Sequence, residues 1–122
     1  MELQRVMGKR ILLVEDERWV RECIKRLLVL DAHTVTEAAS GDEAVELFAS
    51  SQFDVVITDY DMPRMDGDEL MANIRHRAPL QTIVMITACA DRFITEDSHA
   101  NAILGKPFGI AELRQTLAAL LT

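Results

Sequence analysis

Five short apolar runs separated by helical patterns constrain the fold of this chain more than any other feature. The runs are Arg10–Val14, Thr34–Ala38, Val55–Asp59 and residues 82–87 and 102–106. Most of them are continuously apolar and rich in β-branched residues, which is typical of strands buried on both faces of a parallel sheet. Apolar residues at helical spacing fill the intervals between the runs. Alternating strands and helices therefore predict an α/β fold with helices on both faces of the sheet.

The helical segments have recognisable starts and ends. Residues 18–30 form the first, Ser40 and Glu43 open the second as a capping box, and Pro79 ends the third. The last runs from Ile110 to Leu121. Only 14 residues, 88–101, separate the fourth strand from the fifth, so the fourth helix is expected to be short or irregular. Five strand–helix units are too few for a closed eight-unit barrel, which leaves an open doubly wound sheet.

Length and charge limit the functions available to the chain. Its 122 residues suit a single domain over 1–122, with residues 1–9 as a short N-terminal extension. Thirteen Lys and Arg against twenty Asp and Glu give a net charge of −7, which disfavours direct nucleic-acid binding. Cys23 and Cys89 form no CxxC pair, and no apolar run is long enough to insert into a membrane. We therefore expect a cytoplasmic protein.

Polar side chains of complementary chemistry follow four of the five predicted strands. Glu15 and Asp16 follow the first strand, Asp59 ends the third, Thr87 ends the fourth and Lys106 ends the fifth. In an open α/β sheet these positions share one edge, where ligands bind. Converging carboxylates repel by about 4 kcal/mol per close pair at an effective dielectric of 20. A Mg²⁺ ion would remove this repulsion, and a carboxylate beside it could accept a phosphoryl group, with the amine and hydroxyl balancing the charge.

These residues carry a family resemblance. The stretch VVITDYDMPRMDG at 55–67, with Glu15-Asp16 before it and the segments ITA and GKPF after it, resembles a bacterial response-regulator receiver domain. The resemblance covers essentially the whole chain in order. It implies a flavodoxin-like doubly wound five-stranded parallel sheet with strand order 2-1-3-4-5, and a site between strands 1 and 3.

The resemblance also implies roles for individual residues. Asp59 would be the phosphoacceptor, and Thr87 and Lys106 would bind the phosphoryl group. Asp16, Asp59 and the main-chain carbonyl of Asp61 would hold Mg²⁺, with Glu15 helping through water. The peptide bond between Lys106 and Pro107 would be cis.

Partners follow from the same resemblance. A sensor histidine kinase or a histidine phosphotransfer protein would donate the phosphoryl group, and the phosphorylated chain could dimerise. The chain would be no enzyme beyond its own phosphorylation and dephosphorylation. Two alternative functions compete with this one. An aspartyl-phosphate phosphatase of the haloacid dehalogenase type shares a DxD motif, at 59–61, but its acids should lie downstream. A degenerate receiver would lack the set of Asp16, Asp59, Thr87 and Lys106.

Some positions depart from the family pattern. Asp61 and Cys89 border the expected phosphoryl position and could alter the lifetime of an acyl phosphate. Ile103 stands where many relatives have an aromatic switch residue, so activation is expected to act on the segment 88–101 instead. For Trp19, which could also flank the site as a partner contact, we favour a place covering an edge of the core. Each of the three histidines is expected to lie on the surface.

Overall fold

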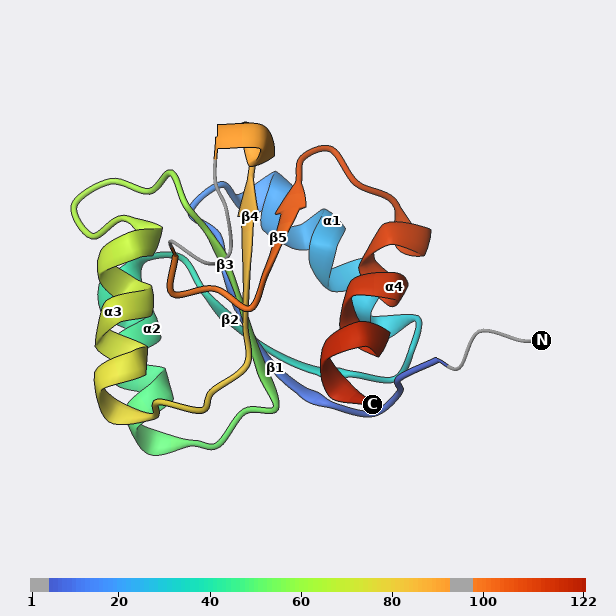
Figure 1. The fold of residues 1–122 in the computed structure, drawn as a ribbon, viewed down its shortest axis with the longest axis horizontal. Coiled ribbons are helices and arrows are strands. Elements are labelled where there is room, and N and C mark those ends of the chain that lie inside the picture. Colours follow the sequence, from blue (N-terminus) through green and yellow to red (C-terminus); the bar gives the residue numbers. More distant parts are fainter. Residues whose placement is uncertain (1–4, 93–97) are drawn as a thin grey trace.

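The structure, a computed structural model that describes residues 5–92 and 98–122, confirms the predicted α/β fold (Figure 1). Its elements are β1 (Arg10–Val14), α1 (Arg18–Val29), β2 (Thr34–Ala38), α2 (Gly41–Ser50), β3 (Val55–Asp59), α3 (Gly67–Arg77), β4 (Ile83–Thr87), the 3₁₀ turn η1 (Ala90–Arg92), β5 (Ala102–Gly105) and α4 (Ile110–Leu121). The five strands form one parallel sheet in the order β2-β1-β3-β4-β5, as the resemblance implied. The strand order reverses between β1 and β3, and a doubly wound sheet binds ligands at this switch point.

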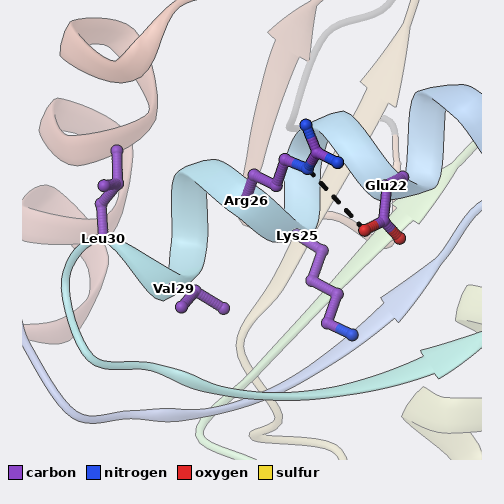
Figure 2. A pocket seen from close by; sticks show the side chains of 5 residues that line it. All are labelled: Glu22, Lys25, Arg26, Val29 and Leu30. Carbon is purple, nitrogen blue, oxygen red and sulfur yellow. Dashed lines mark ion pairs between the residues drawn. The ribbon is translucent and has the colours of Figure 1, made fainter.

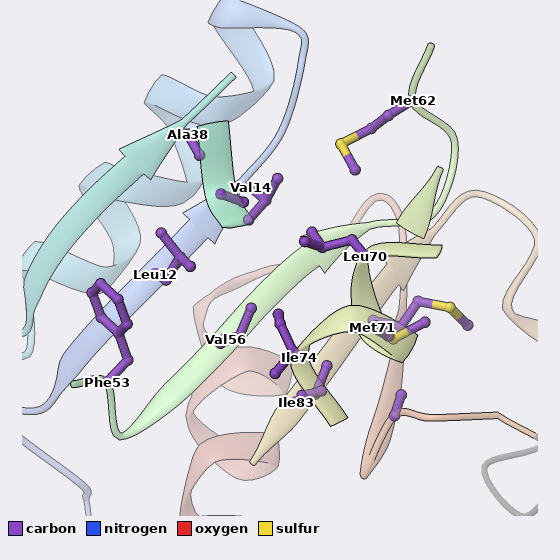
Figure 3. Close-up of a cluster of buried hydrophobic side chains, with 13 residues drawn as sticks. Leu12, Val14, Ala38, Phe53, Val56, Met62, Leu70, Met71, Ile74 and Ile83 are labelled. Atoms are coloured by element: carbon purple, nitrogen blue, oxygen red, sulfur yellow. The ribbon is translucent and has the colours of Figure 1, made fainter. Parts of the chain in front are cut away.

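Helices cover both faces of the sheet (Figure 1). On one face, α2 and α3 pack against side chains such as Leu12 and Val56, and this cluster is drawn in Figure 3. On the other face, α1 and α4 pack against side chains such as Leu13 and Ile57. Consecutive strand residues point to opposite faces, so a strand covered on both sides must be apolar throughout. This requirement explains the continuous apolar runs of the sequence.

Two strands are one residue shorter than predicted. β4 begins at Ile83 rather than Thr82, and β5 ends at Gly105 rather than Lys106. Lys106 still donates its backbone N–H to the carbonyl of Thr87, at 2.8 Å. Its peptide bond to Pro107 is cis, as the resemblance implied. The chain therefore leaves the sheet directly at the residue whose amine was predicted to belong to the site.

At the starts of α2 and α3, a side chain accepts a backbone N–H group that has no carbonyl partner within the helix. Ser40 Oγ accepts from the N–H of Glu43 at 3.1 Å, as the capping pattern predicted. Asp66 does the same for α3, accepting from the N–H of Glu69 at 2.9 Å. None of the helices in the described part of the chain has the length and hydropathy needed to cross a lipid bilayer.

The connection from β4 to β5 was predicted to hold a short or irregular fourth helix. Its described part contains the three-residue turn η1. Residues 93–97 lie outside the described residues, and so does part of the segment 88–101 that was expected to respond to activation. Ile103, on β5, is half-buried and packs against the cluster of Figure 3.

Two predictions about single residues are wrong. Trp19 does not cover the core, because 78% of its surface is exposed on the outer side of α1, where Arg18 lies 5.9 Å from its ring. His33 is not on the surface, since it is 5% exposed and its Nδ1 accepts the backbone N–H of Lys9 at 3.0 Å. His33 lies in the turn between α1 and β2, where no hydrophobic period marks which side chains point inward.

Candidate functional site

Three carboxylates meet at the carboxyl ends of β1 and β3. One oxygen from each of Glu15, Asp16 and Asp59 lies within 4.8 Å of the others. Glu15 is 0% exposed and Asp59 is 4% exposed. The strand register causes this meeting, because Val14 lies opposite Thr58 and the acids follow directly. The structure therefore brings together the three predicted carboxylates, and we call them the acid cluster.

Lys106 reaches into the acid cluster from the end of β5. Its Nζ lies 2.7 Å from Glu15 Oε1 and 3.2 Å from Asp59 Oδ1. The lysine side chain is 24% exposed, so its stem is largely covered while its amine faces the two buried acids. The sequence predicted the amine at this edge, but it did not predict Glu15 as its nearer partner.

Thr87 ends β4, between the strand of Asp59 and the strand that precedes Lys106. Asp59 lies opposite Ile86 in the register, so Thr87 is one residue farther along the same edge. Its side chain is buried, and its Oγ1 accepts the backbone N–H of Cys89 at 3.2 Å. Cys89 is half-buried and its thiol is free. Its place beside a phosphoryl group stays a prediction.

The backbone that follows Asp59 is held tightly against the start of α3. Gly67 donates its N–H to the carbonyl of Tyr60 at 2.8 Å. A Cβ at Gly67 would lie 2.5 Å from the Asp59 carbonyl oxygen and 2.7 Å from the Cα of Tyr60, so glycine is required there. Asp61 lies in the exposed loop between these residues. The role of its main-chain carbonyl as a metal ligand stays a prediction.

The electrostatics of the site reflect an excess of acids. Burial raises the pKa of Asp16 above its ordinary value, and the neighbouring Glu15 raises it further. For Lys106, burial alone would lower the pKa, but the hydrogen bond to Glu15 and the charge of Asp59 outweigh it and raise the pKa overall. The lysine is thus held in its charged form, while the carboxylates repel one another. A divalent cation would relieve that repulsion, and an all-oxygen donor set suits Mg²⁺.

One contact at the site was not predicted from the sequence. Arg21, on α1, donates from Nη1 to the main-chain carbonyl of Glu15 at 2.8 Å. An arginine on a helix surface gives no sequence signal for such a contact, although its place one turn into the helix after the acidic pair was a usable hint. By contrast, a depression on α1 is lined by Glu22, Lys25, Arg26, Val29 and Leu30 and holds none of the predicted site residues (Figure 2).

Two solved structures with the same fold contain magnesium. TrrA of Thermotoga maritima, solved in complex with Mg²⁺ and BeF, is 33% identical, with a TM-score of 0.85 over 93% of this chain and 99% of that one. The same protein was also solved in complex with the histidine kinase ThkA. The receiver domain of the sensor histidine kinase PA1611 of Pseudomonas aeruginosa PAO1, with magnesium coordinated in its active-site cleft, is 31% identical, with a TM-score of 0.85 over 93% and 97% of the two chains.

Sequence comparison points the same way. The response regulator MprA of Mycobacterium ulcerans is 38% identical over 118 residues, which cover 94% of this chain and 51% of MprA. The chain thus spans about half the length of this relative. These matches give no support to the phosphatase alternative. The family model of the response regulator receiver domain matches residues 11–118, and the chain therefore belongs to the receiver domains of two-component response regulators.

Proposed function

We propose that Asp59 is the phosphoacceptor of this receiver domain and that a phosphohistidine is the donor. One observation carries the proposal. Asp59 ends the central strand as a buried carboxylate inside the acid cluster, 3.2 Å from the Lys106 amine. Buried carboxylates beside an amine are suited to react with a phosphoryl group. Its charge needs a cation on one side and a metal held by oxygen ligands on the other.

In the proposed reaction, a carboxylate oxygen of Asp59 attacks the phosphorus atom of the phosphohistidine. The phosphorus–nitrogen bond breaks, and the imidazole nitrogen keeps the electron pair and takes up a proton. The product is an acyl phosphate on Asp59. Lys106 and the hydroxyl of Thr87 bind the oxygens of the transferred group, and later attack by water releases inorganic phosphate and restores the carboxylate.

Mg²⁺ is the proposed cofactor. Asp16, Asp59 and the main-chain carbonyl of Asp61 would hold it directly, and Glu15 through water. When bound, the ion neutralises charge on the phosphoryl oxygens and on the acids. Support comes from the three carboxylate oxygens within 4.8 Å and from the magnesium recorded with TrrA and the PA1611 receiver domain.

Lys106 is proposed to link the phosphoryl group to the rest of the domain. Its amine now pairs with Glu15 and Asp59, and a phosphoryl group on Asp59 would offer it a stronger partner. This exchange would pull on the end of β5. Phosphorylation itself needs the Asp59 nucleophile rather than the lysine.

The partner is proposed to be a sensor histidine kinase or a histidine phosphotransfer protein, supported by the complex of ThkA with TrrA. We expect the chain to act in the cytoplasm, to transform no separate substrate and to bind no nucleic acid itself. Dimerisation on phosphorylation is part of the proposal and can be followed by gel filtration with beryllofluoride.

The test of the phosphoacceptor is the intact mass after incubation with acetyl phosphate and Mg²⁺. One phosphoryl group should be added to the wild type, and none to Asp59→Asn. Asp68→Asn is the matched control, because it makes the same change at an exposed acid of α3 outside the proposed site and should still be labelled. Full labelling of Asp59→Asn would refute the assignment.

A further inference from the structure

Arg21 joins α1 to the strand that carries the acidic pair. Its Nη1 donates to the Glu15 carbonyl at 2.8 Å, and its Nε lies 3.4 Å from Glu37 Oε1 on β2. The arginine side chain is 18% exposed and that of Glu37 is 31% exposed, so both contacts are partly shielded from water. Lys25, one turn later on α1, pairs with the other oxygen of Glu37 at 3.1 Å.

The contacted carbonyl belongs to the peptide unit that joins Glu15 to Asp16. The other side of Glu15 is fixed as well, because its backbone N–H donates to the carbonyl of Ala38 on β2 at 3.1 Å. Asp16 follows the end of β1 and is only half-buried, so surrounding side chains restrain it little. Its Cα belongs to the same peptide unit, and the orientation of that unit therefore sets the position of the Cα. A guanidinium held by a second partner restrains that orientation better than a single rotatable donor could.

We propose that Arg21 is a positioning residue for the metal site: it fixes the Glu15–Asp16 peptide and thereby the direction of the Asp16 carboxylate. The proposal rests on the proposed function, since it assumes that Asp16 binds Mg²⁺. Groups that orient metal ligands affect metal affinity by about 10- to 100-fold when they are removed.

Positioning and simple charge predict opposite results for Arg21. A nearby cation repels Mg²⁺, so its removal should strengthen metal binding if charge were the whole effect. Loss of the carbonyl contact frees the peptide and should weaken metal binding. The sign of the change therefore separates the two explanations.

The experiment measures Mg²⁺ affinity of the full chain by isothermal titration calorimetry for Arg21→Gln, Arg21→Lys and Lys25→Gln. Lys25→Gln is the matched control, because it removes one positive charge from the same helix and the same Glu37 network without touching Glu15. Figure 2 shows Lys25 extending from α1 next to the ion pair of Glu22 and Arg26. Thermal melts in EDTA report on folding without metal.

We expect Arg21→Gln to lower Mg²⁺ affinity about tenfold. Arg21→Lys should lower it less, because the ammonium keeps the charge but cannot hold the Glu15 carbonyl and Glu37 in the geometry of a guanidinium. Lys25→Gln should leave the affinity unchanged or raise it slightly. Equal affinities of Arg21→Gln and Lys25→Gln would overturn the proposal, as would tighter binding by Arg21→Gln. If Arg21→Gln fails to fold, Arg21→Lys decides: wild-type affinity in that variant also overturns it.

A fourth variant keeps this outcome separate from the proposed function. Asp16→Asn should lose Mg²⁺ binding whether or not Arg21 has a positioning role. If Asp16→Asn binds Mg²⁺ like the wild type, the metal site itself is wrong. If Asp16→Asn loses binding while the Arg21 variants keep it, only the positioning role fails.

Discussion

The two ends of the sheet both bury acids, but they balance them differently. At the amino end, Asp31 precedes β2 and is 3% exposed, and Arg114 on α4 donates to both of its carboxylate oxygens, at 2.9 and 3.0 Å. Arg5 lies 3.9 Å away as a second cation. At the carboxyl end, Lys106 pairs with Glu15 and Asp59, two of the three acids of the acid cluster. One end has its charges matched, and the other has an excess of negative charge.

The pKa values follow this difference. The hydrogen bond from Arg114 lowers the pKa of Asp31, whereas burial and the neighbouring Glu15 raise the pKa of Asp16. A matched acid stabilises the folded chain, while an unmatched one costs stability until a ligand arrives. Burial of an acid therefore does not by itself mark a functional site. The imbalance of charge around it does.

The largest effect is expected from breaking the matched end. Asp31→Asn removes the charge that holds Arg114 and should lower the free energy of unfolding by about 2 kcal/mol, the value of hydrogen bonds to a charged group. Urea unfolding in EDTA measures it. Asp61→Asn, an exposed acid changed in the same way, should shift the midpoint little. A midpoint of Asp31→Asn equal to that of Asp61→Asn would show that the amino-end pair contributes nothing.

The two ends of the sheet also differ in how much of each could be predicted from the sequence. The strands and the acid cluster could be predicted, because buried parallel strands must be apolar and their ends share one edge. The pair of Asp31 and Arg114 could not, since 83 residues separate its members and no motif links them. The contact of Arg21 with the main-chain carbonyl of Glu15 was missed for another reason: the two residues are close in sequence, but an arginine on a helix surface does not specify which acceptor it reaches. Trp19 is a different case: the spacing of Val20 and Ile24 already placed it outside the buried face of its helix.

A smaller, pH-dependent effect is expected at the amino end from His33. Burial lowers the pKa of this imidazole, and its Nε2 has no hydrogen-bond partner among the residues that the structure describes. Asp31 and Asp54 oppose the shift, while Lys9 adds to it. The folded chain therefore favours the neutral ring, so its stability is complete above the ordinary pKa of about 6.5 and falls as the pH drops below it.

The measurement is urea unfolding between pH 7.5 and 5 for the wild type and His33→Asn. One proton contributes a slope of at most about 1.4 kcal/mol per pH unit. The asparagine oxygen can still accept from Lys9, so the variant should lose much of the slope without losing that bond. His76→Asn, on an exposed histidine of α3, should keep the wild-type slope. An unchanged slope in His33→Asn would assign the acid sensitivity to another group.

The smallest expected effect has the opposite sign and lies at the carboxyl end. Because the folded-state pKa of Asp16 is raised, its carboxylate costs stability at neutral pH, and the cost disappears as the pH falls through that pKa. Asp16→Asn removes the cost and should raise the free energy of unfolding in EDTA by about 1 kcal/mol, as found for groups kept for function. Saturating Mg²⁺ should then stabilise the wild type and leave the variant unchanged, since a ligand stabilises only the chain that binds it.

The two acid-to-amide changes, Asp31→Asn and Asp16→Asn, thus differ in sign without metal. If both changes destabilise the chain, the negative charge of the acid cluster is already neutralised by Lys106 and the buried groups around it. The excess of negative charge would then say nothing about the chemistry of the cluster.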